Sequence, residues 1–162
     1  MKRSVTVIVC VVLGATVLAT YAAAGPPTKV SFDAPFTDTV TGICSFPLDL
    51  TGSFRGTETD FFDQSGELVR AHIHVVEQDT FSANGKSLTG EPFTFNIFLS
   101  FEDGEVTAVL ARGVAEKIRL PNGKLFLSAG VIDFLAQGVD FSIRTDHGVT
   151  GDIDALCAAL AP

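Results

Sequence analysis

Apolar and polar side chains alternate with a period of two along most of the chain after its first 24 residues. The alternation is regular in 68–76 and in 93–101, where Phe98 is an apolar residue on the otherwise polar face. It returns in 139–144, whereas 124–135 is largely apolar on both faces. Because successive side chains of a strand point to opposite faces, these four segments are predicted strands.

Turn signals separate the predicted strands at hairpin-length intervals. Each signal combines Gly with Asp, Asn, Ser or Pro, which tolerate a positive φ or cap a tight turn. About seven to nine antiparallel strands in series predict an all-β fold, namely an up-and-down β-barrel or, as the alternative, a β-sandwich. The turn segments are 63–67, 82–87, 102–105, 121–124 and 145–148.

The tail, 151–161, has a helical rather than an alternating pattern. Asp152 is suited to cap a short helix there, because its carboxylate can accept from the first free backbone N–H groups. The helix would present one apolar stripe to the core. Its members are Ile153, Leu156, Cys157 and Leu160.

The first 24 residues have the features of a secretory signal peptide. Lys2 and Arg3 precede an uncharged apolar run, and Ala22–Ala24 supplies small residues suited to cleavage. The alternative is a retained membrane anchor. We therefore expect a signal peptide over 1–24, a single domain over 25–162 and an extracellular location.

Charge narrows the range of partners. The nine Lys and Arg of 25–162 against 19 Asp and Glu leave a net charge of −10. Such a surface repels phosphate backbones and anionic membranes, so neither nucleic-acid binding nor stable membrane insertion after cleavage is expected.

Two cysteines, Cys44 and Cys157, remain beyond the predicted signal peptide. In an oxidising compartment an even pair most simply forms a disulfide. The alternatives are a metal-binding pair or a catalytic thiol, and no Cys-x-x-Cys motif supports either.

Three histidines are the candidate metal ligands. His72 and His74 share one face of a predicted strand, and His147 lies in a later turn segment. Three imidazoles could bind zinc. The neighbouring Arg70 disfavours a second positive charge, so we interpret the pair as the polar face of the strand and predict neither a metal nor another cofactor.

Catalytic motifs are scarce. The chain has no Gly-x-Ser-x-Gly motif, and its two Asn-Gly-Lys segments are turns rather than phosphate-binding loops. Glu58 and Asp60 share a strand face and could form a glycosidase pair, although acidic residues on a solvated face are the simpler interpretation. The chain is not expected to be an enzyme, and no catalytic residue is assigned.

Several stretches resemble a family of small secreted actinobacterial proteins. They are "CSFP" (44–47), "AHIHVVEQDTFSANGKSLTGEPFTF" (71–95), "RGVAEKIRLPNGKLFLSAGVIDF" (112–134) and "GDIDALCAALA" (151–161). The resemblance implies secretion and a β-rich fold, and it brings no active-site residues. Family members often have Asn-Pro before the central turn, whereas this chain has Ser82-Ala83, so the resemblance does not extend to the type of that turn.

The leading functional hypothesis is a lipocalin-like barrel that binds a small apolar ligand. The first alternative is an extracellular structural or interaction protein without a ligand pocket. A cyclase or isomerase acting at the barrel mouth, or a metal-dependent enzyme, comes next. A Phe-lined cavity of several hundred Å³ would favour the binding protein, as ligand sites are about 300–1,000 Å³.

Overall fold

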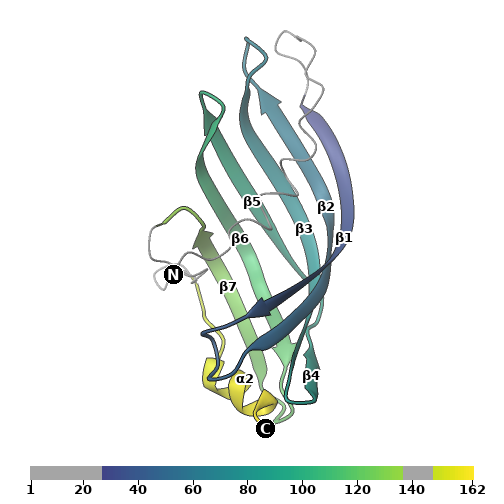
Figure 1. The fold of residues 1–162 in the computed structure, drawn as a ribbon. Coiled ribbons are helices and arrows are strands. Elements are labelled where there is room, and N and C mark those ends of the chain that lie inside the picture. The colour runs from purple at the N-terminus through teal and green to yellow at the C-terminus, as the bar shows by residue number, and fades with distance from the viewer. Residues whose placement is uncertain (1–26, 137–147) are drawn as a thin grey trace.

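The computed structural model describes residues 27–136 and 148–162, which form one curved antiparallel sheet and one short helix (Figure 1). Antiparallel pairing is expected from the alternating patterns and the tight turns between them. The elements are β1 (Thr28–Val40), β2 (Leu48–Phe62), β3 (Leu68–Ala83), β4 (Lys86–Thr89), β5 (Phe93–Glu102), β6 (Glu105–Arg119), β7 (Leu125–Asp133) and α2 (Ile153–Leu160).

The sheet has the order β1-β2-β3-β5-β6-β7, with β4 paired to the far end of β3. The all-β class, the antiparallel series and the C-terminal helix are therefore confirmed. The described strands do not close into the predicted barrel. A closed barrel needs hydrogen bonds between its first and last strands. Here β1 and β7 are separate edges, and β7 gains only an isolated bridge from Ala129 to Val149. The strand predicted over 139–144 lies outside the described residues.

Two hairpin turns have the backbone that their sequences predict. Asn84 and Gly85 have φ values of 53° and 75°, and Asp103 and Gly104 have 52° and 78°. Positive φ at both central residues is the two-residue turn that matches the twist of antiparallel strands. The Asn-Gly-Lys segment at 84–86 is therefore a hairpin turn.

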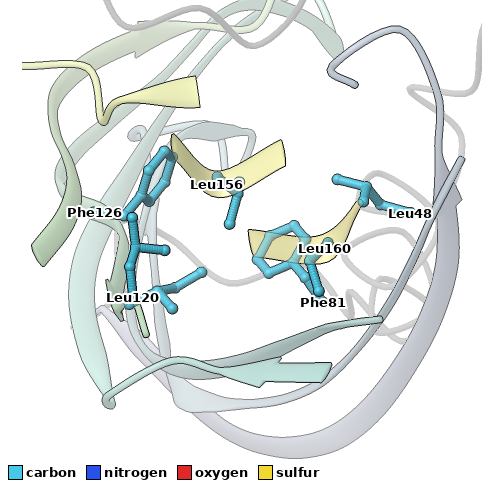
Figure 2. Close-up of a cluster of buried hydrophobic side chains, with 7 residues drawn as sticks. Leu48, Phe81, Leu120, Phe126, Leu156 and Leu160 are labelled. Atoms are coloured by element: carbon cyan, nitrogen blue, oxygen red, sulfur yellow. The ribbon is translucent and has the colours of Figure 1, made fainter. Parts of the chain in front are cut away.

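One face of the sheet, called the inner face here, carries two hydrophobic clusters. The lower cluster lies where α2 crosses the end of the sheet, and Figure 2 shows Leu156 and Leu160 of α2 facing Phe81 and Phe126 of the strands. Asp152 caps α2 as predicted, with the Ala155 N–H donating to its Oδ1 at 3.0 Å. The full cluster is Leu48, Phe81, Ile118, Leu120, Phe126, Leu156 and Leu160.

The upper cluster occupies the same inner face farther from α2. It consists of Ala71, Ile73, Val75, Ile97, Leu99 and Ala111, with half-buried rings packed against it. Two of the rings on β1 lie across glycines of β2. Phe32 is opposite Gly56 and Phe36 is opposite Gly52, and a Cβ at either glycine would meet the ring within 2.7 Å. Glycine is required at both positions because each phenylalanine ring occupies the space that a side chain on the glycine would need.

Among the described residues, no helix is long and apolar enough to span a bilayer.

Candidate functional site

Between the two hydrophobic clusters, the inner face of β3 changes from apolar to acidic. The alternation that buries Val75 continues through Glu77 and Asp79 before it returns to Phe81. A strand of period two therefore places both carboxyls inside rather than in solvent. Asp79 is only 5% exposed and Glu77 is half-buried.

A third carboxyl reaches this level from β6 because that strand contains a β-bulge. The register of β6 against β7 shifts between Val114 and Glu116. A one-residue shift reverses which side chains face inward, so Glu116 follows Gly113 on the inner face. Glu116 is 6% exposed, whereas the next residue, Lys117, extends to the outer face.

Asp79 and Glu116 belong to β3 and β6, which do not pair with each other. Their carboxyls nevertheless interact, because no strand lies between β3 and β6 at this level. The strand β5 begins at Phe93, and below that point Gly90 separates β3 from β6. The Gly90 N–H donates to the Asp79 carbonyl at 2.7 Å. A Cβ on Gly90 would lie 2.9 Å from Glu116 Oε1, so the missing side chain leaves the space that the carboxyl occupies.

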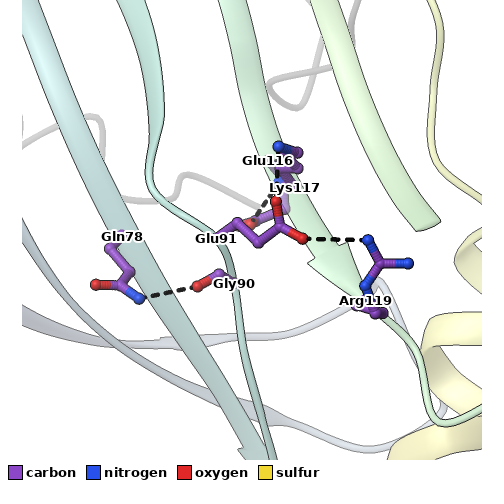
Figure 3. Close-up of polar contacts among 6 residues, drawn as sticks. All are labelled: Gln78, Gly90, Glu91, Glu116, Lys117 and Arg119. Atoms are coloured by element: carbon purple, nitrogen blue, oxygen red, sulfur yellow. Dashed lines mark hydrogen bonds and ion pairs between the residues drawn. The ribbon is translucent and has the colours of Figure 1, made fainter. Parts of the chain in front are cut away.

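The segment around Gly90 is fixed from both sides (Figure 3). Gln78 Nε2 donates to the Gly90 carbonyl at 3.0 Å, and the Glu91 N–H donates to the Lys117 carbonyl at 2.7 Å. On the outer face, Lys117 Nζ pairs with Glu91 at 2.6 Å. These contacts hold β3 and β6 at the separation at which their carboxyls meet.

We call Glu77, Asp79 and Glu116 the carboxyl cluster. Burial raises the pKa of Glu77 to about 8, with a further contribution from the charge of Asp79. Burial likewise raises the pKa of Glu116 to about 8, and the Lys117 N–H that donates to it partly opposes the shift. Burial also raises the pKa of Asp79, although hydrogen bonds from Glu116 and Glu77 oppose the effect. Glu77 and Glu116 therefore keep their protons at neutral pH, and their hydrogen bonds to Asp79 favour its ionised form.

Asp79 is nonetheless incompletely satisfied. No N–H or hydroxyl group of the described residues donates to its buried Oδ1, so only protonated neighbouring carboxyls can hydrogen-bond to Asp79. No described Lys, Arg or His forms an ion pair with the cluster either. A buried carboxylate without a cationic partner is costly, and such exceptions call for an explanation.

A second acidic pair lies on the inner face at the opposite end of β2. As predicted, Glu58 and Asp60 share a strand face, opposite Ile73 and Ala71 of β3. Burial, followed by the charge of Asp60, raises the pKa of Glu58 to about 7. Burial also raises the pKa of Asp60, and its interactions with Glu58 and Thr28 oppose the shift. A glycosidase pair at these two residues stays a hypothesis from the sequence.

The histidine pair lies on the outer face of the sheet. His72 Nε2 and His74 Nδ1 both contact Asn96 Oδ1, at 3.0 and 3.2 Å. His72 also stacks on Phe98, with ring centroids 4.8 Å apart. This contact explains the apolar residue on the polar face of the strand. His147 lies outside the described residues, and within those residues no group of three or more His, Cys, Asp or Glu is arranged to hold a metal ion.

Two shallow hollows also lie on the outer face. One of about 220 Å³ is lined by residues that include Phe61, Arg70 and Phe98. The other, of about 150 Å³, is lined by residues that include Arg55 and Gln78. Both are smaller than the about 300–1,000 Å³ of typical ligand pockets.

The predicted disulfide between Cys44 and Cys157 is present, with the two Cα atoms 5.5 Å apart. It connects the β1–β2 connection to α2 beside the lower hydrophobic cluster, against which Cys44 packs. The bond therefore fastens the helix over the end of the sheet.

Sequence reasoning did not select the carboxyl cluster. A signal for two of its members was present, since Glu77 and Asp79 continue the apolar face of 68–76 in register. Glu116 gave no such signal, because its inward orientation depends on the bulge in β6.

In comparisons with known proteins, no family model, no curated protein and no solved structure matches the chain.

Proposed function

We propose that the chain is an extracellular binding protein whose curved sheet works as a lipocalin-like, barrel-shaped container for a small, mainly apolar ligand. The disulfide and the predicted signal peptide support the extracellular location. The inner face supports the ligand class, because aromatic side chains from several strands gather on it.

The observation that carries this proposal is the row of half-buried rings beside the upper hydrophobic cluster. Phe54 has ring centroids 5.8 Å from Phe32 and 5.9 Å from Phe36, and Phe95 of β5 packs against the same cluster. Rings that keep part of their surface exposed on an inner face can bury it against a ligand, which is favourable by about 25 cal/mol per Å². The carboxyl cluster then supplies the few polar groups that orient a ligand in such a site.

Native mass spectrometry of the secreted protein, followed by titration with the apolar fluorophore N-phenyl-1-naphthylamine, tests the proposal. We expect a retained small molecule or saturable fluorophore binding, weakened by Phe54→Ala. Phe98→Ala is the matched control, since this ring lies on the outer face and should not affect binding. Equal effects of the two substitutions, or no binding at all, would contradict the proposal.

Proton-transfer catalysis is the second candidate, and the carboxyl cluster favours it. A carboxylate beside two carboxylic acids that keep their protons at neutral pH supplies both a general base and a general acid. If the retained molecule is a substrate, incubation with the protein in D₂O should exchange a carbon-bound hydrogen for deuterium. Glu116→Gln should abolish this exchange, and a molecule recovered without deuterium would leave binding as the function.

A further inference from the structure

We propose that the carboxyl cluster of Glu77, Asp79 and Glu116 holds the ammonium group of a primary amine whose apolar tail lies on the rings of the inner face. The inference rests on the proposed ligand-binding function and specifies the chemical class of the ligand.

The number of hydrogen-bonding groups supports a primary ammonium group. An alkylammonium has three N–H donors and no acceptor. The cluster offers three carboxyls from two strands, and Asp79 Oδ1, in a residue 5% exposed, has no N–H or hydroxyl donor among the described residues. A bound ammonium would supply the missing donor together with a positive charge.

The charge also matches. Burial raises the pKa of Glu77 and of Glu116 to about 8, so both keep their protons at neutral pH, and Asp79 is the member whose ionised form a neighbouring cation would stabilise. The residues opposite the cluster's members in the sheet are uncharged: Gly52 and Phe54 on β2, Phe93 on β5 and Ser128 on β7. A single cation would therefore supply Asp79 with the charged partner that the described residues do not provide.

A metal ion fits less well than an ammonium group. No group of described acidic residues is arranged to hold one. Divalent oxygen sites also use ionised carboxylates, whereas two of these three carboxyls are protonated at neutral pH. Ammonium binding needs only one carboxylate, because neutral carboxyls still have acceptor oxygens.

The position of Glu77 defines the side from which the ammonium would enter. Asp79 and Glu116 are both buried, whereas Glu77 is half-buried and lies next to the upper cluster and its rings. An amine lying on those rings would therefore meet Glu77 first, with Asp79 one alternate position farther along β3.

The test is calorimetric titration of the secreted protein at pH 7 with octylamine, octan-1-ol and octyltrimethylammonium. The three probes share one tail, and only octylamine has both a positive charge and N–H donors. We expect octylamine to bind at least about tenfold more tightly than either of the others, since hydrogen bonds to charged groups are among the stronger ones. We also expect proton release in buffers of different ionisation enthalpy, because a bound cation lowers the pKa of neighbouring carboxyls.

Glu77→Gln and Asp79→Asn should each remove the preference for octylamine over octan-1-ol. Glu58→Gln is the matched control, because Glu58 is an inner-face carboxyl in the separate acidic pair. Circular dichroism verifies folding, and if Asp79→Asn is unfolded, Glu77→Gln and the proton release in the wild type decide the result.

Other results of the titrations would overturn the inference, and they differ in what they say about the proposed function. Equal binding of octylamine and octan-1-ol overturns the inference and leaves apolar ligand binding intact, whereas binding of none of the probes overturns both. Equal binding of octyltrimethylammonium shows attraction by net charge alone and overturns the inference. Displacement of octylamine by Ca²⁺ at equimolar concentration identifies a metal site instead, and a preference that survives both cluster substitutions places the amine elsewhere.

Discussion

Gly52 of β2 lies directly opposite Asp79 of β3, and the space above this glycine is where the Asp79 carboxyl is accommodated. A Cβ at Gly52 would be 2.4 Å from Asp79 Oδ1 and 2.6 Å from the Phe36 ring. The buried carboxyl therefore depends on a missing side chain on the neighbouring strand, just as Glu116 depends on Gly90.

Gly52→Ala is predicted to destabilise the protein by about 1–3 kcal/mol, the usual cost of adding a methyl group to filled space. Either Asp79 or Phe36 must move, because both lie within 2.7 Å of the added Cβ. Urea unfolding followed by circular dichroism measures the effect. Thr51→Ala is the control, because Thr51 is exposed on the outer face of the same strand. A variant as stable as this control would contradict the packing described here.

Stability is predicted to fall as the pH rises from about 4.5 to about 8. Glu77 and Glu116 have pKa values raised to about 8 in the folded protein, against 4.5 as the ordinary value. Because the folded state binds these protons more tightly than the unfolded state, the stabilisation is complete below the unfolded pKa and is lost as pH rises through the folded pKa.

The double variant Glu77→Gln/Glu116→Gln should show a smaller decline when urea unfolding is repeated at pH 5, 6.5 and 8. Glu91→Gln is the control: Lys117 lowers the pKa of Glu91, so this variant removes a contribution of the opposite sign and leaves the decline in place. Parallel curves for wild type and the double variant would show that the cluster does not cause the pH dependence.

Loss of the disulfide is predicted to cost about 4–5 kcal/mol, as expected for a closed loop of this length. The two cysteines are 113 positions apart, so the unfolded chain gains much conformational freedom when the bond is removed. Cys44→Ser/Cys157→Ser and the reduced wild type should unfold at the same, lower urea concentration. Peptide mass mapping verifies the bond, and an unchanged midpoint after verified reduction contradicts the prediction.

The β3–β4 turn is predicted to stabilise the end of α2 through Asn84. Its Nδ2 donates to the Leu160 carbonyl at 2.9 Å, and Lys86 Nζ donates to the next carbonyl, that of Ala161. Asn84→Ala should cost about 1–2 kcal/mol, because it loses this hydrogen bond and places alanine at a positive φ.

Asn84→Gly separates the two contributions, since glycine tolerates the backbone but lacks the amide. It should lie between wild type and Asn84→Ala in urea unfolding. If Asn84→Gly is as stable as wild type, the contact with α2 contributes nothing measurable.

The sequence by itself determined the features that depend on local pattern. Period-two alternation predicted strands at 68–76 and 93–101, and Asn84-Gly85 predicted a hairpin turn, because side-chain direction and positive φ are properties of neighbouring residues. The disulfide followed from residue type and the predicted signal peptide, and the Asp152 cap followed from residue type and position.

Only the tertiary structure decided the carboxyl cluster and the open edges of the described sheet. Glu116 faces inward because of a bulge in β6, and it meets Asp79 because β5 begins too late to separate them and Gly90 has no side chain. Such contacts depend on strand register and on where each strand ends. Those properties arise from pairing between distant segments, and the period of a single segment does not contain them.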